Sequence, residues 1–98
     1  MATYITTIKF TEQGVQGIRD SAKRAAAFKT AAKKMGIKVT ATYWTLGHFD
    51  GVLIFEAPDD ETATAAMLQL SAQGNVHTST ARAFGSAEMD NIVKLMAK

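Results

Sequence analysis

The residues of this chain that are best suited to chemistry gather in one stretch, residues 43–50. This octet holds the only tryptophan of the chain, one of its two histidines and a carboxylate. Imidazole and carboxylate groups carry protons in many reactions, and aromatic rings pack against apolar ligands. We therefore predict a ligand-binding set from the octet and one arginine further along the chain: Tyr43, Trp44, Gly47, His48, Phe49, Asp50 and Arg82.

Three side chains are candidates for catalysis, namely His77, Asp50 and Arg82. His77 is either a hydrogen-bonded polar residue of a strand or a proton carrier in a cavity. Asp50 either bonds nearby amides of a turn or acts as a general base near Tyr43 or Trp44. Arg82 is suited to hold an anion or a carboxylate of another subunit. In an enzyme, these groups should converge on one point of a cavity.

Metal and cofactor signatures are absent from the sequence. The chain has no cysteine, which removes disulfides, thiolate nucleophiles and cysteine-ligated metals. The spacing of His48 and His77 does not support a shared metal site, and no phosphate-loop or dinucleotide signature occurs. The acidic run Pro58-Asp59-Asp60-Glu61 is explained by a helix start, because its carboxylates face the positive end of the helix dipole. We expect neither a metal nor a cofactor.

Length and composition indicate one domain over residues 1–98. Hydrophobic residues make up 47% of the chain, which allows a modest core. The net charge is +2, and the basic residues of the first half fit a solvated helix face better than a nucleic-acid footprint. No apolar run approaches the roughly 20 residues of a membrane span, and no signal peptide is visible. We expect a cytoplasmic protein that binds neither nucleic acid nor a membrane.

Hydrophobic periodicity predicts strands at residues 4–10, 37–45, 51–57 and 76–84. After a break at residues 11–14, an apolar stripe from Val15 to Met35 predicts one long helix. A second helix opens at Pro58 and closes near Gly74, and a third follows Gly85. The order β-α-β-β-α-β with a carboxyl-terminal helix predicts a ferredoxin-like α+β fold, with a four-stranded antiparallel sheet and two helices on one face.

The third strand carries a further prediction about assembly. Its run Val52-Leu53-Ile54-Phe55 places large apolar groups on both faces of the sheet, whereas a half-exposed antiparallel strand alternates apolar and polar residues. Two helices cover only one face, and a bare apolar face marks an interaction site. We expect a second copy to cover it in a homodimer. The alternative is that the last helix folds over that face within one chain.

Several blocks of the sequence, in order, resemble the GYD domain family. They include the octet, the segment Glu56-Ala57-Pro58-Asp59-Asp60-Glu61, and the segments Gly74-Asn75-Val76 and Arg82-Ala83-Phe84. The Gly-x-Tyr-Asp motif of the family falls on Gly47, His48, Phe49 and Asp50, with phenylalanine where tyrosine is usual. The missing hydroxyl weakens any mechanism that uses that phenol. The resemblance implies a small bacterial protein of the dimeric α/β-barrel superfamily, without an established activity.

Three functions follow as hypotheses. The first is a homo-oligomer, dimeric or larger, that binds or senses a small apolar or aromatic molecule. The second is a cofactor-independent enzyme acting on a small aromatic or carbonyl substrate. The third is a purely structural assembly subunit, which would show no cavity large enough for a ligand. The sequence favours the first and third, because it offers no adjacent nucleophile and base.

Overall fold

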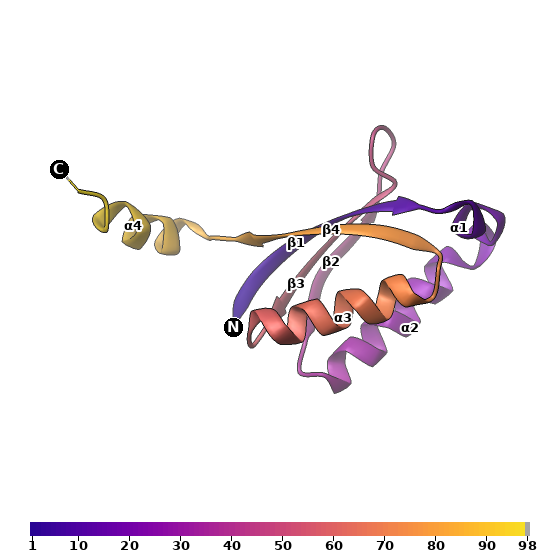
Figure 1. The fold of residues 1–98 in the computed structure, drawn as a ribbon, viewed down its shortest axis with the longest axis horizontal. Coiled ribbons are helices and arrows are strands. Elements are labelled where there is room, and N and C mark those ends of the chain that lie inside the picture. The colour runs from indigo at the N-terminus through magenta and orange to yellow at the C-terminus, as the bar shows by residue number, and fades with distance from the viewer. Residues whose placement is uncertain (98) are drawn as a thin grey trace.

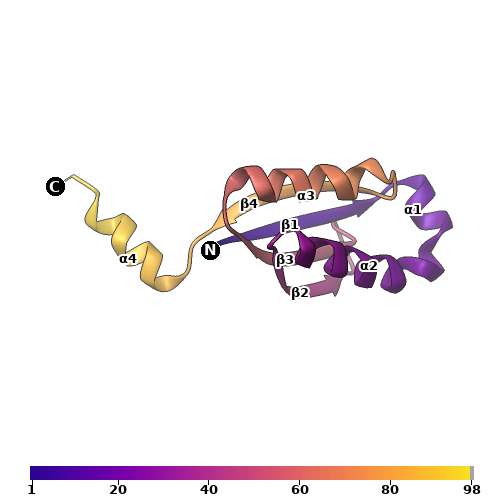
Figure 2. The same ribbon diagram turned by 90° about the horizontal axis from the view of Figure 1, so that it is seen from below.

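The computed structural model describes residues 1–97 and has two layers, a sheet and a pair of helices (Figures 1 and 2). Four antiparallel strands lie in the order β2-β3-β1-β4, and α2 and α3 cover one face. The elements along the chain are β1 (Ala2–Phe10), α1 (Glu12–Gln16), η1 (Ile18–Asp20), α2 (Ser21–Lys34), β2 (Lys38–Trp44), β3 (Gly51–Ala57), α3 (Asp60–Ala72), β4 (Val76–Ala83) and α4 (Ser86–Lys94). This arrangement confirms the predicted ferredoxin-like α+β fold.

The core lies between the sheet and the two helices. On this covered face, Tyr4 of β1 pairs with Phe55 of β3, and their rings stack with centroids 5.2 Å apart. Thr6 is the one buried polar side chain among the described residues, and its hydroxyl lies 2.7 Å from that of Thr80 on β4. Burial of the core side chains therefore leaves no hydroxyl group without a hydrogen-bond partner among the described residues. The same burial fixes which face of each strand points to the helices.

The opposite face of the sheet is open. Ile5 of β1 pairs with Ile54 of β3, which in turn pairs with Ala41 of β2, so an apolar row crosses three strands. Tyr43 pairs with Val52 in the next row. Ile5 is 39% exposed and Tyr43 is 61% exposed. Within residues 1–97, no helix lies over this face (Figure 1).

The long helix predicted from Val15 to Met35 is wrong, because α1, η1 and α2 share that stretch. The expected break at residues 11–14 is where α1 starts, since the Thr11 side chain accepts a hydrogen bond from the amide of Gly14. A Cβ on Gly14 would lie 2.0 Å from the carbonyl oxygen of Asn75, so only glycine fits there. The turn between α1 and η1 at Gly17 is stabilised by Arg24, whose guanidinium donates to the Gly17 carbonyl at 2.6 Å.

The acidic run after β3 starts a helix, as predicted. Asp59 is the N-cap of α3, and its carboxylate accepts a hydrogen bond from the Thr62 amide at 2.7 Å. Hydrogen bonds from Thr62 lower the pKa of Asp59, because they stabilise the charged carboxylate. The described residues contain no group of three or more side chains placed to hold a metal ion. None of the helices in this part of the chain is long and apolar enough to cross a membrane.

The last helix, α4, extends away from the rest of the molecule (Figure 1). It does not fold over the open face, so the alternative of cover from within one chain is wrong. The extension makes the molecule long, with extents of 53 × 31 × 18 Å. Its radius of gyration is 15.0 Å, whereas a compact chain of this length has about 13 Å.

Candidate functional site

The octet forms the end of β2, a connecting loop and the residue before β3, as predicted. Its loop projects from the sheet on the side away from α2 and α3 (Figure 1). The amide of Thr45 donates to the carbonyl of Asp50 at 3.0 Å, and the Thr45 hydroxyl donates to the carbonyl of Phe49 at 2.7 Å. Gly47 has a φ of +128°, a conformation that side chains disfavour. These bonds close the loop on itself.

Asp50 ties the octet to β1. Its carboxylate accepts a hydrogen bond from the Phe10 amide at 2.8 Å, and its own amide donates to the Ile8 carbonyl at 2.9 Å. The contact resembles that of a turn carboxylate, except that the amide belongs to β1 and not to the turn. A carboxylate held in this way positions the loop, and it also lines a cavity on the covered side of the sheet.

Tyr43 and Trp44 point to opposite sides of the sheet, as strand alternation predicts. The indole nitrogen of Trp44 donates to the hydroxyl of Ser21 at the start of α2, at 2.8 Å. Trp44 therefore lies on the side of the helices, and Tyr43 lies on the open face beside Val52. Both residues are among those that line the cavity, and of the two rings it is that of Trp44 that lies on the side of α2.

The cavity lies between the covered face and the helices α2 and α3, and has a volume of about 80 Å³. Among its polar lining residues, Asp50, Arg24 and Trp44 each already make a side-chain hydrogen bond within the chain. The cavity is smaller than the roughly 150 Å³ of an engineered apolar cavity that binds benzene. It suits a very small apolar molecule, and an aromatic ligand requires it to widen. The apolar lining consists mainly of Ile8, Phe10, Phe28, Leu53, Leu70 and Val76.

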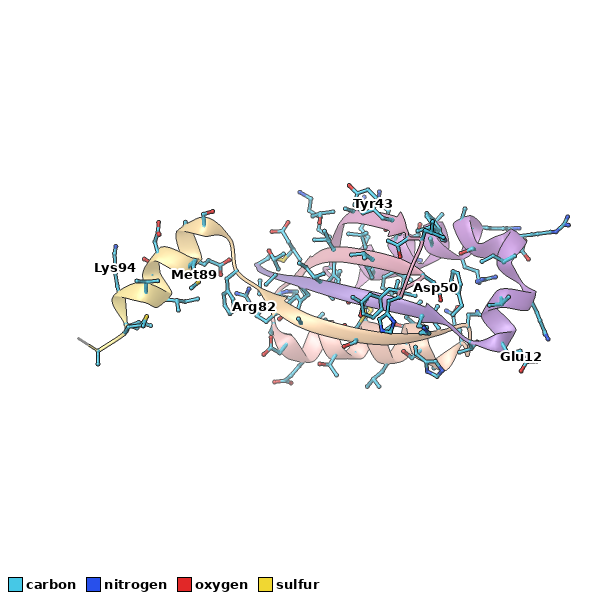
Figure 3. All side chains as sticks on the ribbon, turned by 90° about the horizontal axis from the view of Figure 1, so that it is seen from above. Glu12, Tyr43, Asp50, Arg82, Met89 and Lys94 are labelled. Atoms are coloured by element: carbon cyan, nitrogen blue, oxygen red, sulfur yellow. The ribbon has the colours of Figure 1, made fainter. Side chains whose placement is uncertain are left out.

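The three catalytic candidates do not converge. His77 pairs with Lys9 on the open face, whereas Arg82, five residues further along β4, pairs with Tyr4 on the covered face. Five residues of a strand also separate the two by about 17 Å. Asp50 lies toward the other end of the sheet from Arg82 (Figure 3). No common point of the cavity is within reach of all three groups.

The two histidines have ordinary surroundings. His48 lies edge-on to Phe49, with ring centroids 4.7 Å apart, and its carbonyl accepts a hydrogen bond from Lys9 at 3.1 Å. His77 is exposed on β4. The two belong to different elements, and no metal-binding group includes either of them in the described part of the chain.

Arg82 holds a carboxylate, but that carboxylate belongs to its own chain. Its guanidinium donates to Glu88 of α4 at 3.0 Å and lies 4.6 Å from the centre of the Phe84 ring. This hydrogen bond, with a second from the Gly85 amide, lowers the pKa of Glu88. Sequence reasoning assigned Arg82 to an anion or another subunit, and it missed Glu88 because the turn after β4 decides that contact.

A half-buried hydrogen-bonded pair near Arg82 was also missed. The hydroxyl of Tyr4 donates to the Asp60 carboxylate, and this bond raises the pKa of the Tyr4 phenol. The two residues are 56 positions apart in the chain, so no local pattern indicates the contact. Asp60 lies in the first turn of α3, where its charge also favours the helix dipole.

Comparisons with known proteins agree with this geometry. Residues 4–93 match the family model of the GYD domain. The chain is 31% identical over 90 residues to the glutamine synthetase and cystathionine beta-lyase binding protein of Thermus thermophilus, covering 91% of this chain and 95% of that protein.

Two solved structures share the fold. The 5-chloro-2-hydroxyhydroquinone dehydrochlorinase TftG of Burkholderia phenoliruptrix has a TM-score of 0.64 at 16% identity, over 87% of this chain and 96% of that one. TTHA0845 of Thermus thermophilus has a TM-score of 0.57 at 22% identity, over 88% of this chain and 96% of that one. Identities this low show the fold alone.

Proposed function

This chain belongs to the GYD domain family, and from that premise we propose that it is a homodimeric binding protein without catalysis of its own. Two copies pair through their open sheet faces. The pair then binds other proteins, as the name of the Thermus relative describes for that protein.

The open face carries this proposal. Its apolar row of Ile5, Ile54 and Ala41 has no cover from the chain's own helices. The accessible surface of one copy is 6841 Å², whereas a compact monomer of 10.5 kDa exposes about 5,400 Å². The excess of about 1,400 Å² is more than the roughly 800 Å² that each partner buries in a standard interface. The extended helix α4 contributes part of this excess, and a second copy on the open face would bury another part of it.

The positions of the polar groups favour binding over catalysis. His77, Asp50 and Arg82 lie on different faces or ends of the sheet. Asp50 and Arg82 are already bonded within the chain, to the Phe10 amide and to Glu88. An active site needs a nucleophile or base aimed at a shared point, together with a stabilising group. We propose the cytoplasm of a bacterium as the compartment, in line with the cysteine-free sequence and the bacterial relative.

The proposal is tested with purified proteins. Light scattering is expected to give twice the 10.5 kDa of one chain. Under those conditions, glutamine synthetase from the same organism is titrated onto the immobilised protein by interferometry. Saturable binding supports the proposal. A dimer that binds neither glutamine synthetase nor cystathionine beta-lyase contradicts the protein-binding role.

A small apolar ligand in the cavity is a second candidate function. The largely apolar lining beside Trp44 favours it. Native mass spectrometry of the freshly purified protein is expected to show a bound small molecule, which the Leu70→Phe variant loses because the larger ring fills the cavity. Leu68→Phe is the matched control, since Leu68 is 66% exposed on α3. Detection of only ligand-free protein in the parent and in both variants would exclude this function.

A further inference from the structure

The strand β2 lies at the edge of the sheet, so one side of its backbone has no neighbouring strand. Within residues 1–97, the backbone of residues 38–44 makes no hydrogen bond to another main-chain group outside the sheet. A shift of register between Val39 and Ala41 interrupts the ladder, and regular pairing with β3 then continues to Trp44. Unpaired peptide groups along an edge are a template for a strand of another chain. The run from Ala41 to Trp44 can therefore accept a further strand.

The free peptide groups of β2 belong to alternate residues, because antiparallel strands alternate between hydrogen-bonded and non-hydrogen-bonded pairs. The amide of Thr45, just after β2, donates to the Asp50 carbonyl, so the backbone groups of this pair face each other. Two residues earlier, the backbone groups of Tyr43 face β3 in the same way. Thr42 and Trp44 are the alternate residues, and their N–H and C=O groups therefore point out of the edge.

A groove runs along this edge, between α2 and β2, and has a volume of about 320 Å³. Ala22, Ala25 and Ala26 form part of its α2 side, and their short side chains leave room for the side chains of an added strand. Thr42 and Trp44 contribute to its β2 side. The free peptide groups and the groove therefore form one surface.

The groove carries positive charge. Lys29 of α2 lines it, and Lys33 follows one turn later on the same side of the helix. Among the described residues that line the groove, none is acidic. In the part of the chain that the structure describes, the one ion pair joins Arg82 and Glu88, so no carboxylate neutralises either lysine. An acidic side chain of a partner therefore meets a complementary charge here.

We propose that this groove binds an extended acidic segment of another protein, which adds a fifth strand to the sheet beside β2. The inference rests on the protein-binding role proposed above, and it names the surface and the kind of segment. Hydrogen bonds to the outward groups of Thr42 and Trp44 supply affinity, while a carboxylate near Lys29 and side chains packed over the alanines of α2 select the segment. Because α2 forms one side of the groove, the groove lies on the covered side of the sheet, away from the face proposed to pair two copies.

The first test removes one outward amide in the full-length protein. Thr42→Pro has no amide hydrogen to donate, whereas Thr42→Val keeps the amide and changes only the side chain. Proline is tolerated on an edge strand where its N–H would face solvent. Thr42→Pro should weaken binding of glutamine synthetase at least tenfold in interferometry, or of cystathionine beta-lyase if only that enzyme binds the parent. Thr42→Val should bind as the parent does, and equal binding by all three proteins would overturn the strand addition.

The second test fills the groove without changing the backbone of β2. Ala26→Trp places a large ring where the added strand would lie and should weaken binding of the same enzyme at least tenfold. Ala27→Trp is the matched control, because Ala27 is exposed on α2 and does not line the groove. Circular dichroism and light scattering check that each variant keeps the fold and the mass of the parent. Equal binding by Ala26→Trp and Ala27→Trp would overturn the assignment of the groove.

Hydrogen exchange locates the contact in the parent protein, which needs no variant to fold. Peptides that contain residues 41–44 should exchange more slowly when the enzyme is bound, because the outward amides are then hydrogen-bonded. Enzyme binding without this protection overturns the strand addition and leaves the protein-binding role intact. A Thr42→Pro protein that loses the dimer but still binds the enzyme shows that a second copy occupies the edge, which also overturns it. A parent that binds neither enzyme removes the protein-binding role itself.

Discussion

The covered and open faces of the sheet are made by alternate residues of the same strands, yet they differ sharply. On β3, Phe55 is fully buried against Tyr4, while its neighbour Ile54 lies on the other side of the sheet. On β1, Thr6 is fully buried and Ile5 is 39% exposed. The covered face is completed by helices of the same chain, and the open face is not. Apolar side chains on a strand therefore indicate that their face of the sheet is stabilised by burial. They do not indicate whether the same chain or a second copy covers that face.

The largest expected effect separates the two neighbours on β3. Phe55→Ala should lower the free energy of unfolding by about 3–5 kcal/mol, because it leaves a cavity under the stacked Tyr4 ring. Ile54→Ala should cost about 1 kcal/mol or less in the monomer, since its surroundings are already open. Urea denaturation at dilutions where the protein is monomeric measures both. Equal losses would show that the open face is packed within one chain.

The next effect separates the two threonines on β1. The Thr6 hydroxyl bonds to that of Thr80, so Thr6→Val should cost about 1 kcal/mol by leaving Thr80 without this partner. Thr7 lies on the open face and its hydroxyl makes only a long contact of 3.4 Å to the Ser79 carbonyl. Thr7→Val should leave the unfolding midpoint in urea unchanged. The comparison fails if Thr7→Val proves the more destabilising of the two.

The smallest effect is a pH dependence at the start of α3, one of the two helices that complete the covered face. The pKa of Asp59 is lowered in the folded chain, so its charge stabilises the fold above the unfolded pKa of about 3.9. This contribution is lost as the pH falls through the lower, folded pKa. Asp59→Asn keeps a good N-cap but has no charge to titrate. The difference in melting temperature between the parent and Asp59→Asn should therefore shrink from pH 6 to pH 3, as followed by circular dichroism. A constant difference would contradict the assignment.

Much of the fold follows from the sequence, because strand and helix periods are local signals. The apolar run at residues 52–55 correctly indicated two apolar faces, and the alternation of Tyr43 and Trp44 correctly indicated opposite sides. The sequence could not predict whether Tyr43 or Trp44 points toward the helices, since a shift of one residue in strand register exchanges the sides of the two residues. The helix break at Gly17 was missed because the apolar stripe continues across it, while Arg24 stabilises the turn from seven residues away.

The candidate site was harder to predict, because its members meet only through the tertiary fold. Asp50 was recognised as a turn or cavity residue, but its bond to the Phe10 amide depends on the pairing of β1 and β3. The Arg82 contact with Glu88 depends on how the chain turns between β4 and α4. No local pattern indicates that His77 and Arg82 occupy opposite faces until the strand is placed in its sheet.

Sedimentation equilibrium of three proteins tests most directly whether a second copy covers the open face. The parent and Leu68→Lys, which changes an exposed leucine on α3, should both sediment with twice the 10.5 kDa of one chain. Ile5→Lys places a charge in the centre of the open face and should sediment as a single folded chain. A parent protein that stays monomeric as its concentration rises, or an Ile5→Lys dimer as tight as the parent, would contradict the account.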